Sequence, residues 1–388
     1  MNHHQPAGIY IHIPFCLRKC LYCDFYSVTD MSLQQVFAKS LVSEIKMASD
    51  VQFRSDTLYI GGGTPSVFDA ENISRIIESV CHSFTILPGS EITIETNPGT
   101  VTLGQLRDYC SAGINRINIG VQSLTDKNLK FLGRIHSARD GHLAIEWARK
   151  AGFDNLGIDL IYGIPGQTKK TWLSDLNKAV EFEPEHLSCY VLTYEPGTPL
   201  HNGLQKGLLC PMDEKPEADL FETTIEFLSD NGYMQYEISN FARSVSNSSV
   251  SKRSRHNQKY WSGVPYRGFG PSAHSFTGTE RFWNCYSVEK YINEIDAGRL
   301  PTEGKETLTR EQQIIEAVYV GLRKTHGIDI RRFDEKFGIS FNRTFREAVC
   351  CFKENGLIKT DSEYCVLSRK GMLFHNSIVS FIISHSSF

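Results

Sequence analysis

The sequence lacks a hydrophobic run long enough to cross a membrane, because no stretch approaches the roughly 18 apolar residues that a spanning helix needs. The apolar segment near its end, 377–384, is short and mixed, and we expect it to pack as a helix. The opening residues, MNHHQPAGIY, contain neither the cationic and apolar regions of a signal peptide nor an arginine-rich transit pattern. We therefore expect a cytoplasmic protein.

The sequence also lacks an excess of charge of either sign. It contains 41 Lys and Arg residues and 44 Asp and Glu residues, which gives a net charge of -3. This balance does not favour nucleic acid as the main partner. The chain has 11 cysteines, and an odd number without a signal peptide argues against a disulfide framework and indicates a reducing compartment.

Three of the cysteines are clustered. Cys16, Cys20 and Cys23 have C-x3-C-x2-C spacing and follow a short apolar segment that predicts a strand entering a loop. Three thiolates are one fewer than a 4Fe-4S cluster normally takes, so one iron would stay open to another ligand. Two alternatives remain at this point: a zinc knuckle with His12 as fourth ligand, or three separate buried thiols.

Strand-like and helix-like segments alternate from residue 8 to about residue 195. The periodicity predicts strands at 57–60, 91–95, 117–122, 155–162 and 186–192, and helices at 33–47, 73–84, 103–112, 141–151 and 172–180. About six such βα units imply parallel strands with helices outside, in an open sheet or a full or partial barrel. Function is then expected at the carboxyl ends of the strands.

The C-terminal part has a different pattern. After a boundary at 301–309, helices at 311–322, 330–337 and 345–355 and a hairpin near 357–367 predict a winged-helix-like module. Its helices are not unusually basic, so packing against the core is favoured over DNA binding. We predict a core with its extension at 1–240, a linker segment at 241–305 and a C-terminal helical domain at 306–388. The serine-rich stretch 244–255 is expected to be a mobile loop or an insertion.

Several polar residues and a glycine turn stand at predicted strand ends. The turn is Gly61-Gly62-Gly63-Thr64-Pro65, which lets a ligand approach the backbone closely. The polar residues are Glu95, Gln122 and Asp159, and Arg134 follows the second of these strands. Carboxylates could hold hydroxyl or ammonium groups, and an arginine could hold a carboxylate. Taken singly, each is also explained as a helix cap or a surface ion pair.

Together the motifs carry a family resemblance. CLRKCLYC resembles the cysteine loop of radical SAM proteins, and YIHIPFC, GGGTP, IETNP, IGVQS, IDLIYGIPGQT and HNQKYW resemble the HemW heme chaperones. That group is related to oxygen-independent coproporphyrinogen III dehydrogenase. The resemblance extends from residue 8 to about residue 375 and implies a radical SAM partial (β/α)6 TIM-like barrel with a C-terminal helical, winged-helix-like domain.

The resemblance also assigns roles to residues. It implies that Cys16, Cys20 and Cys23 hold a 4Fe-4S cluster whose open iron binds S-adenosylmethionine. The implied S-adenosylmethionine contacts are Tyr10, Tyr22, Gly62, Gly63, Thr64, Glu95, Gln122, Arg134 and Asp159. Heme is implied at His256, Tyr260 and Trp261 of HNQKYW, where an imidazole could ligate iron and aromatic rings could stack on a macrocycle. An isolated segment of this kind would more simply be a structural turn with its aromatics in the core.

Two features separate the branches of this family. The dehydrogenase branch has a fourth cysteine where this chain has Phe25, and HNQKYW matches the chaperone branch. We therefore expect a heme chaperone, with coproporphyrinogen dehydrogenation as the alternative and a DNA-binding regulator as a weaker third reading. His274 and Cys285 could also bind iron, but their spacing does not select them.

The expected partners are a heme-acceptor protein and an electron donor, with no nucleic acid. The sequence predicts no membrane-spanning segment and leaves peripheral membrane contact open, and it is compatible with a monomer or a homodimer. It does not tell whether S-adenosylmethionine is cleaved, or whether heme is attached covalently.

Overall fold

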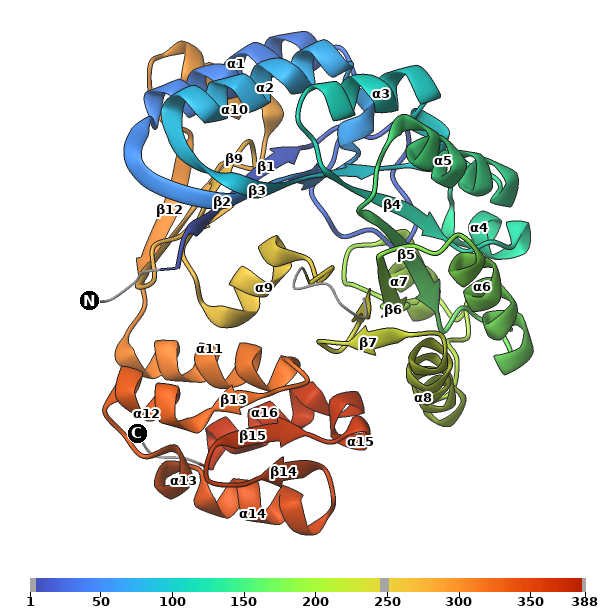
Figure 1. Cartoon of the computed structure of the whole chain (residues 1–388), viewed down its shortest axis with the longest axis vertical. Coiled ribbons are helices and arrows are strands. Elements are labelled where there is room, and N and C mark those ends of the chain that lie inside the picture. Colours follow the sequence, from blue (N-terminus) through green and yellow to red (C-terminus); the bar gives the residue numbers. More distant parts are fainter. Residues whose placement is uncertain (1–4, 245–250, 386–388) are drawn as a thin grey trace.

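The core of the protein is a sheet of parallel strands, as seen in the computed structural model, which describes residues 5–244 and 251–385 (Figure 1). Half of the predicted serine-rich loop 244–255, residues 245–250, lies outside the described residues. Six parallel strands stand in chain order, β1 (Ala7–Ile13), β2 (Asp50–Gly62), β3 (Phe84–Thr96), β4 (Arg116–Gln122), β5 (Leu156–Tyr162) and β6 (His186–Val191). The predicted α/β barrel of six βα units is confirmed.

Helices connect these strands and cover one face of the sheet (Figure 1). They are α1 (Gln34–Met47), α2 (Ala70–Ser83), α3 (Leu103–Ser111), α4 (Asp126–Leu132), α5 (Ala138–Ala151) and α6 (Lys169–Glu181), with short 3-10 turns at Pro65–Val67 and Pro98–Thr100. Asp69, Thr102, Ser137 and Thr168 each accept a backbone hydrogen bond at a helix start. These caps satisfy amide groups that the first helical turn leaves free and so fix where the helices begin.

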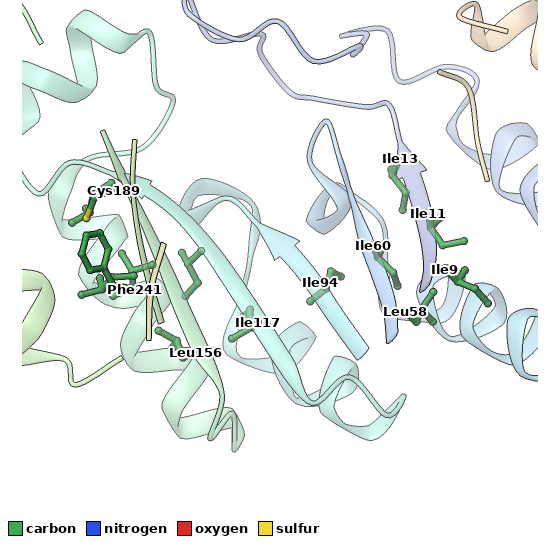
Figure 2. Close-up of a cluster of buried hydrophobic side chains, with 14 of the residues drawn as sticks. Ile9, Ile11, Ile13, Leu58, Ile60, Ile94, Ile117, Leu156, Cys189 and Phe241 are labelled. Carbon is green, nitrogen blue, oxygen red and sulfur yellow. The ribbon is translucent and has the colours of Figure 1, made fainter. Parts of the chain in front are cut away.

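The core lies between the sheet and these helices (Figure 2). Ile9, Ile11 and Ile13 of β1 are fully buried, as are Leu58 and Ile60 of β2. Side chains of a strand alternate between its faces, so the residues between them, such as Tyr10 and Tyr59, turn to the inner side of the barrel. The helix-facing side is therefore apolar, and the inner side carries the polar groups.

Further strands extend the sheet at both edges. Beside β1 stand β9 (Tyr266–Phe269), β10 (His274–Phe276), β11 (Glu280–Asn284) and β12 (Thr302–Thr307), and beside β6 stand β8 (Asn240–Arg243) and β7 (Tyr233–Gln235). Only β9 is parallel to its core neighbour. Among the described residues, the edge strands β12 and β7 do not pair with each other, so the barrel is partial.

The predicted linker segment, 241–305, is structured over most of its described length. It contributes strands β9 to β12 and two helices, α9 (Arg255–Ser262) and α10 (Val288–Asp296). Two more helices precede it, α7 (Pro199–Gln205) and α8 (Glu214–Asp230). The domain bounds drawn from the sequence stay a prediction, but the strands of this segment belong to the main sheet.

The C-terminal module contains α11 (Arg310–Arg323), β13 (Ile328–Asp329), α12 (Ile330–Phe337), α13 (Phe341–Thr344), α14 (Arg346–Glu354), β14 (Ile358–Thr360), β15 (Tyr364–Leu367), α15 (Arg369–Leu373) and α16 (His375–Ser384). The three expected helices and the hairpin are present, and β13 makes a third strand. Ile378, Val379 and Ile382 bury one face of α16, as expected for a packed helix. No helix in the described ranges has the length and apolar character to span a membrane.

Candidate functional site

The cysteine loop follows β1 directly and is closed at its base by backbone hydrogen bonds. The Cys16 amide donates to the Val28 carbonyl at 2.9 Å, and the Val28 amide donates to the Pro14 carbonyl at 2.7 Å. Phe15, between them, is fully buried. The loop that carries Cys16, Cys20 and Cys23 is therefore fixed to the barrel at both ends.

The three thiols lie at the end of β1 in a partly water-excluded place. Cys16 is buried, and Cys20 and Cys23 are half-buried. Burial raises the pKa of Cys16 and raises the pKa of Cys23 to about 11, because it disfavours the thiolate. Binding iron deprotonates a coordinating thiol, so it would overcome this cost.

The zinc alternative receives no support from His12. Its Nδ1 is 3.0 Å from the Tyr10 hydroxyl and its Nε2 is 2.9 Å from the Tyr26 carbonyl oxygen, so both ring nitrogens are engaged. In the part of the chain that the structure describes, no three His, Cys, Asp or Glu side chains are grouped to hold a metal ion. The thiols of a cluster bind different irons and stand further apart than the ligands of one ion. The all-thiol donor set on one loop therefore suits an iron-sulfur cluster better than zinc.

The glycine turn at the end of β2 lies against the same loop. A Cβ on Gly63 would stand 2.8 Å from the Phe15 carbonyl oxygen and 3.1 Å from Cys16 Sγ. Gly62 has φ +112, and a Cβ there would stand 2.8 Å from the His12 ring. Thr64 completes the turn with its hydroxyl 3.3 Å from Cys16 Sγ. Only glycine allows this close approach, which leaves the turn backbone accessible beside the thiols.

Two buried carboxyl groups point into the barrel from neighbouring strands. Glu95 accepts hydrogen bonds from the Tyr59 hydroxyl at 2.6 Å and from the Gly62 amide at 3.3 Å. Asp159 accepts one from Asn118 Nδ2 at 2.5 Å and has Ser188 beside it, while its Oδ1 makes no hydrogen bond of normal geometry in the described structure. Burial raises the pKa of Glu95 to about 7 and that of Asp159 to about 6. A buried oxygen of this kind is suited to a ligand hydroxyl or ammonium group.

Arg134 connects the cysteine loop with the ends of β3 and β4. Its Nη1 lies 3.4 Å from both Cys20 Sγ and the Tyr22 hydroxyl, and its Nη2 donates to Asn97 Oδ1 at 2.9 Å and to the Gly120 carbonyl at 2.6 Å. Burial is the largest influence on Tyr22 and raises its pKa. The guanidinium is thus held in place beside the loop.

Gln122 ends β4 in a left-handed conformation, with φ 66, at an irregularity in the pairing with β5. Its Nε2 lies so close to Gly120 that a Cβ there would approach it to 2.9 Å. Two supporting residues were missed from the sequence: Asn97, which orients Arg134, and His136, whose Nδ1 is 3.1 Å from Asn97 Oδ1. Asn97 belongs to the IETNP motif, which offered a signal that the strand-end argument did not use.

The HNQKYW segment forms α9, which reaches into the barrel. His256 is 1% exposed and stacks on Tyr59 with ring centroids 5.1 Å apart. Its Nδ1 is 2.9 Å from Thr57 Oγ1 and its Nε2 is 2.8 Å from the Tyr260 hydroxyl. Burial lowers its pKa to about 3, so the imidazole stays neutral. Ligation of iron through Nε2 would require the Tyr260 hydroxyl to leave.

Tyr260 and Trp261 lie in the last turn of α9, and α9 runs between the barrel and the C-terminal module (Figure 1). The Tyr260 ring meets the edge of Tyr266 at 4.7 Å. The guanidinium of Arg323, on α11, lies 4.6 Å from the Trp261 ring centroid. α9 therefore links the inside of the barrel with the second domain, a relationship that its spacing in the sequence did not reveal.

Known proteins match the chain along nearly its whole length. The Radical SAM superfamily pattern matches residues 10–179, and that of the HemN C-terminal domain matches residues 308–374. A heme chaperone HemW of Bacillus subtilis is 35% identical to this chain, and the alignment covers 95% of this chain and 97% of that protein. A heme chaperone HemW of Haemophilus influenzae is 37% identical, and the alignment covers 98% of this chain and 98% of that protein. The chain belongs to the HemW family.

This HemW-family chain also resembles a solved structure, the coproporphyrinogen III oxidase HemN from Escherichia coli, described as a radical SAM enzyme. The TM-score is 0.82 at 22% sequence identity, over 98% of this chain and 91% of that chain. At this identity the likeness shows a common fold. The family resemblance expected from the cysteine loop and HNQKYW is confirmed, while the roles of individual site residues stay predictions.

Proposed function

We propose that this HemW-family protein binds heme and passes it to an acceptor protein. The observation that carries the proposal is α9, whose His256 lies beside the predicted cofactor residues and whose Tyr260 and Trp261 border the C-terminal module. The names of the relatives, heme chaperones over nearly their full length, support it. Cytoplasmic localisation, an electron donor and a heme acceptor are parts of this proposal.

The cysteine loop and the strand ends would hold the cofactors of the radical SAM superfamily. Cys16, Cys20 and Cys23 would ligate a 4Fe-4S cluster, and the glycine turn at Gly62, Gly63 and Thr64 would present its backbone to S-adenosylmethionine. When bound, this pair supplies one-electron reductive chemistry at the sulfonium group.

The remaining predicted contacts would orient S-adenosylmethionine. The Oδ1 of Asp159 and the carboxyl of Glu95 would accept hydrogen bonds from its donor groups. Arg134 stands where it can face a carboxylate close to the cluster loop. Tyr10, Tyr22 and Gln122 would complete the walls of the site, and their burial would exclude water.

His256 is the proposed iron ligand of heme. Its low pKa keeps a lone pair available at neutral pH, and Tyr260 is the group that heme would displace from Nε2. On this account His256→Ala should change the optical spectrum of the bound heme, and the exposed His82→Ala should not. An unchanged spectrum in His256→Ala would remove this assignment and leave heme binding itself standing.

The alternative is the coproporphyrinogen dehydrogenase reaction, which the common fold with HemN keeps open. Phe25 opposes it, because it supplies no thiolate at the position of the fourth cysteine and its side chain is 70% exposed. The test is anaerobic incubation of the reconstituted protein with coproporphyrinogen III, S-adenosylmethionine and a reductant. We expect no protoporphyrinogen at catalytic turnover, and its accumulation would overturn the chaperone function.

A further inference from the structure

A large groove separates the barrel from the C-terminal module. It has a volume of about 1940 Å³ and lies between α9, with strands β9 and β10, on one side and α11 and α12 on the other. Typical pockets for small molecules measure roughly 300–1,000 Å³, so this groove has room for a large ligand and stays open to a second protein. None of the predicted cluster or S-adenosylmethionine residues lines it.

The barrel side of the groove is rich in aromatic side chains. Tyr260, Trp261, Tyr266 and Phe276 all line it. Tyr260 and Tyr266 meet edge to face at 4.7 Å, which holds both rings. Arg323 covers Trp261 and restrains the indole, whose N–H is buried without a hydrogen-bond partner in the described structure. Tyr260 is tilted by 88° to Tyr266 and by 68° to Trp261, so the wall offers an aromatic, apolar surface made of ring edges as well as ring faces.

The lining of the groove as a whole is cationic, although the whole chain has a net charge of -3. Five Lys and Arg residues line the groove against two carboxylates. Both carboxylates are already paired, Glu316 with Arg281 at 2.9 Å and Asp329 with Arg332 at 3.3 Å. The cations without an ion-pair partner in the described structure are Arg54, Lys324 and Lys336.

Two of these cations belong to the C-terminal module and reach into the groove. Burial lowers the pKa of both Lys324 and Lys336, because protein removes water from each ammonium group. Lys336 extends from α12 toward the end of α9, where its Nζ lies 3.9 Å from the Cβ position of Gly263. Lys324 is half-buried, so its charge is costly unless an anion binds it, whereas Lys336 is more exposed and contributes by its position at the groove.

We propose that heme occupies this groove, with its macrocycle against Trp261, Tyr266 and Phe276 and its two propionates paired with Lys324 and Lys336. Tyr260, which separates His256 from the groove, is the side chain that must move for His256 to reach the iron. The inference rests on the proposed function and extends it from α9 to the C-terminal module. Heme is a flat apolar disc with two carboxylates on one edge, and the groove pairs an aromatic wall with two ammonium groups. The open side lets an acceptor reach the bound macrocycle without unfolding of the barrel.

The test is a heme titration of the full-length protein, followed by optical spectroscopy. Lys324→Gln/Lys336→Gln is compared with Lys353→Gln/Lys359→Gln, which removes the same charge from exposed positions of the same module. We expect the first variant to bind heme at least about tenfold more weakly than wild type. The control should stay within about twofold, since Lys353 and Lys359 do not line the groove and exposed charges away from a ligand contribute little. Equal dissociation constants in all three proteins would overturn the groove site.

A second probe needs no substitution. Heme dimethyl ester has the same macrocycle without the propionate charges, so wild type should bind heme at least about tenfold more tightly than the ester. Equal affinity for the two would overturn the role of the lysines. An effect of the double substitution on transfer alone, with unchanged heme affinity, would assign the cations to the acceptor and also overturn it. A wild type that binds no heme at all would reject the proposed function itself.

Discussion

Arg323 of α11 lies over the indole ring of Trp261 at 4.6 Å, and its Nε stands 2.7 Å from Oε2 of Glu237. Glu237 is fully buried and precedes β8, whereas Arg323 belongs to the C-terminal module. One guanidinium thus joins both domains and α9. This contact holds the wall of the groove in which we place heme.

Removal of this guanidinium should destabilise the protein. Arg323→Ala leaves the Glu237 carboxylate buried without its cation, and we expect a loss of about 3 kcal/mol in the free energy of unfolding. Arg331→Ala is the control, because its pair with Glu335 is exposed and should contribute less than about 0.5 kcal/mol. Denaturant unfolding of the two variants measures both values. A loss in Arg323→Ala no larger than in the control would show that the pair does not join the domains.

The glycine turn should be essential for cluster assembly. In Gly63→Ala the new Cβ would press on the Phe15 carbonyl and on Cys16 Sγ, so the cysteine loop must shift. After anaerobic reconstitution we expect about four irons per chain in wild type and clearly fewer in the variant. Gly104→Ala is the matched control, because the nearest atom to its Cβ position is 4.0 Å away. Full iron content in Gly63→Ala, or zinc without sulfide in wild type, would contradict the predicted cluster site.

Substitution of Asp159 should increase stability and weaken ligand binding. Its carboxyl is buried with a raised pKa and one oxygen without a hydrogen bond of normal geometry, so Asp159→Asn should remove a desolvation cost and increase stability above about pH 6. The same substitution should weaken S-adenosylmethionine binding about tenfold or more, because the single amide oxygen would accept from Asn118 and the NH2 group would face the donor of the ligand. Isothermal titration and thermal unfolding report the two effects, with the exposed Asp154→Asn as control. Unchanged affinity in Asp159→Asn would separate this residue from the cofactor.

Glu44 of α1 should make stability depend on pH. Its buried carboxyl accepts hydrogen bonds from the Gly270 amide at 2.8 Å, Tyr291 at 2.5 Å and Asn284 at 2.6 Å, and burial raises its pKa to about 7. The folded protein therefore holds this proton more tightly than the unfolded chain. The stabilisation that comes from this proton is fully present below pH 4.5, the ordinary pKa of a glutamate. It is lost as the pH rises to about 7, the pKa of Glu44 in the folded protein.

The comparison is made with Glu44→Gln, which cannot titrate. Between pH 4.5 and pH 7 wild type should lose up to about 3 kcal/mol more than this variant. Denaturant unfolding at several pH values measures the difference, and the exposed Glu347→Gln should follow wild type. Parallel pH profiles for wild type and Glu44→Gln would show that Glu44 does not control this dependence.

The sequence predicts the parallel core well, because each βα unit is a local pattern. Isoleucines of β1 alternate with Tyr10 and His12, and this alternation already indicates an apolar outer face and a polar inner face. The edge strands β7 and β10 to β12 are short and antiparallel, so their pairing depends on partners distant in the chain. For this reason the sequence pattern predicts a linker at 241–305, whereas most of the described part of this segment is helix and strand.

The candidate site, like the fold, could be predicted only in part from the sequence. Cys16, Cys20 and Cys23 are recognised by their spacing, and the structure holds their loop against the glycine turn, as expected from neighbouring strand ends. One nitrogen of His256 contacts Tyr260, four residues later in α9, and the other contacts Thr57 of β2, 199 residues away. No local pattern could indicate the second contact. The groove likewise combines segments from both domains, and its cations look like ordinary helix-surface residues in the sequence.

The central claim is that this protein carries heme. Its most direct test is a heme titration of the anaerobically reconstituted, full-length protein, followed in the Soret region. The account predicts a saturable transition to a spectrum distinct from that of free heme. A titration that rises linearly with the spectrum of free heme would contradict it.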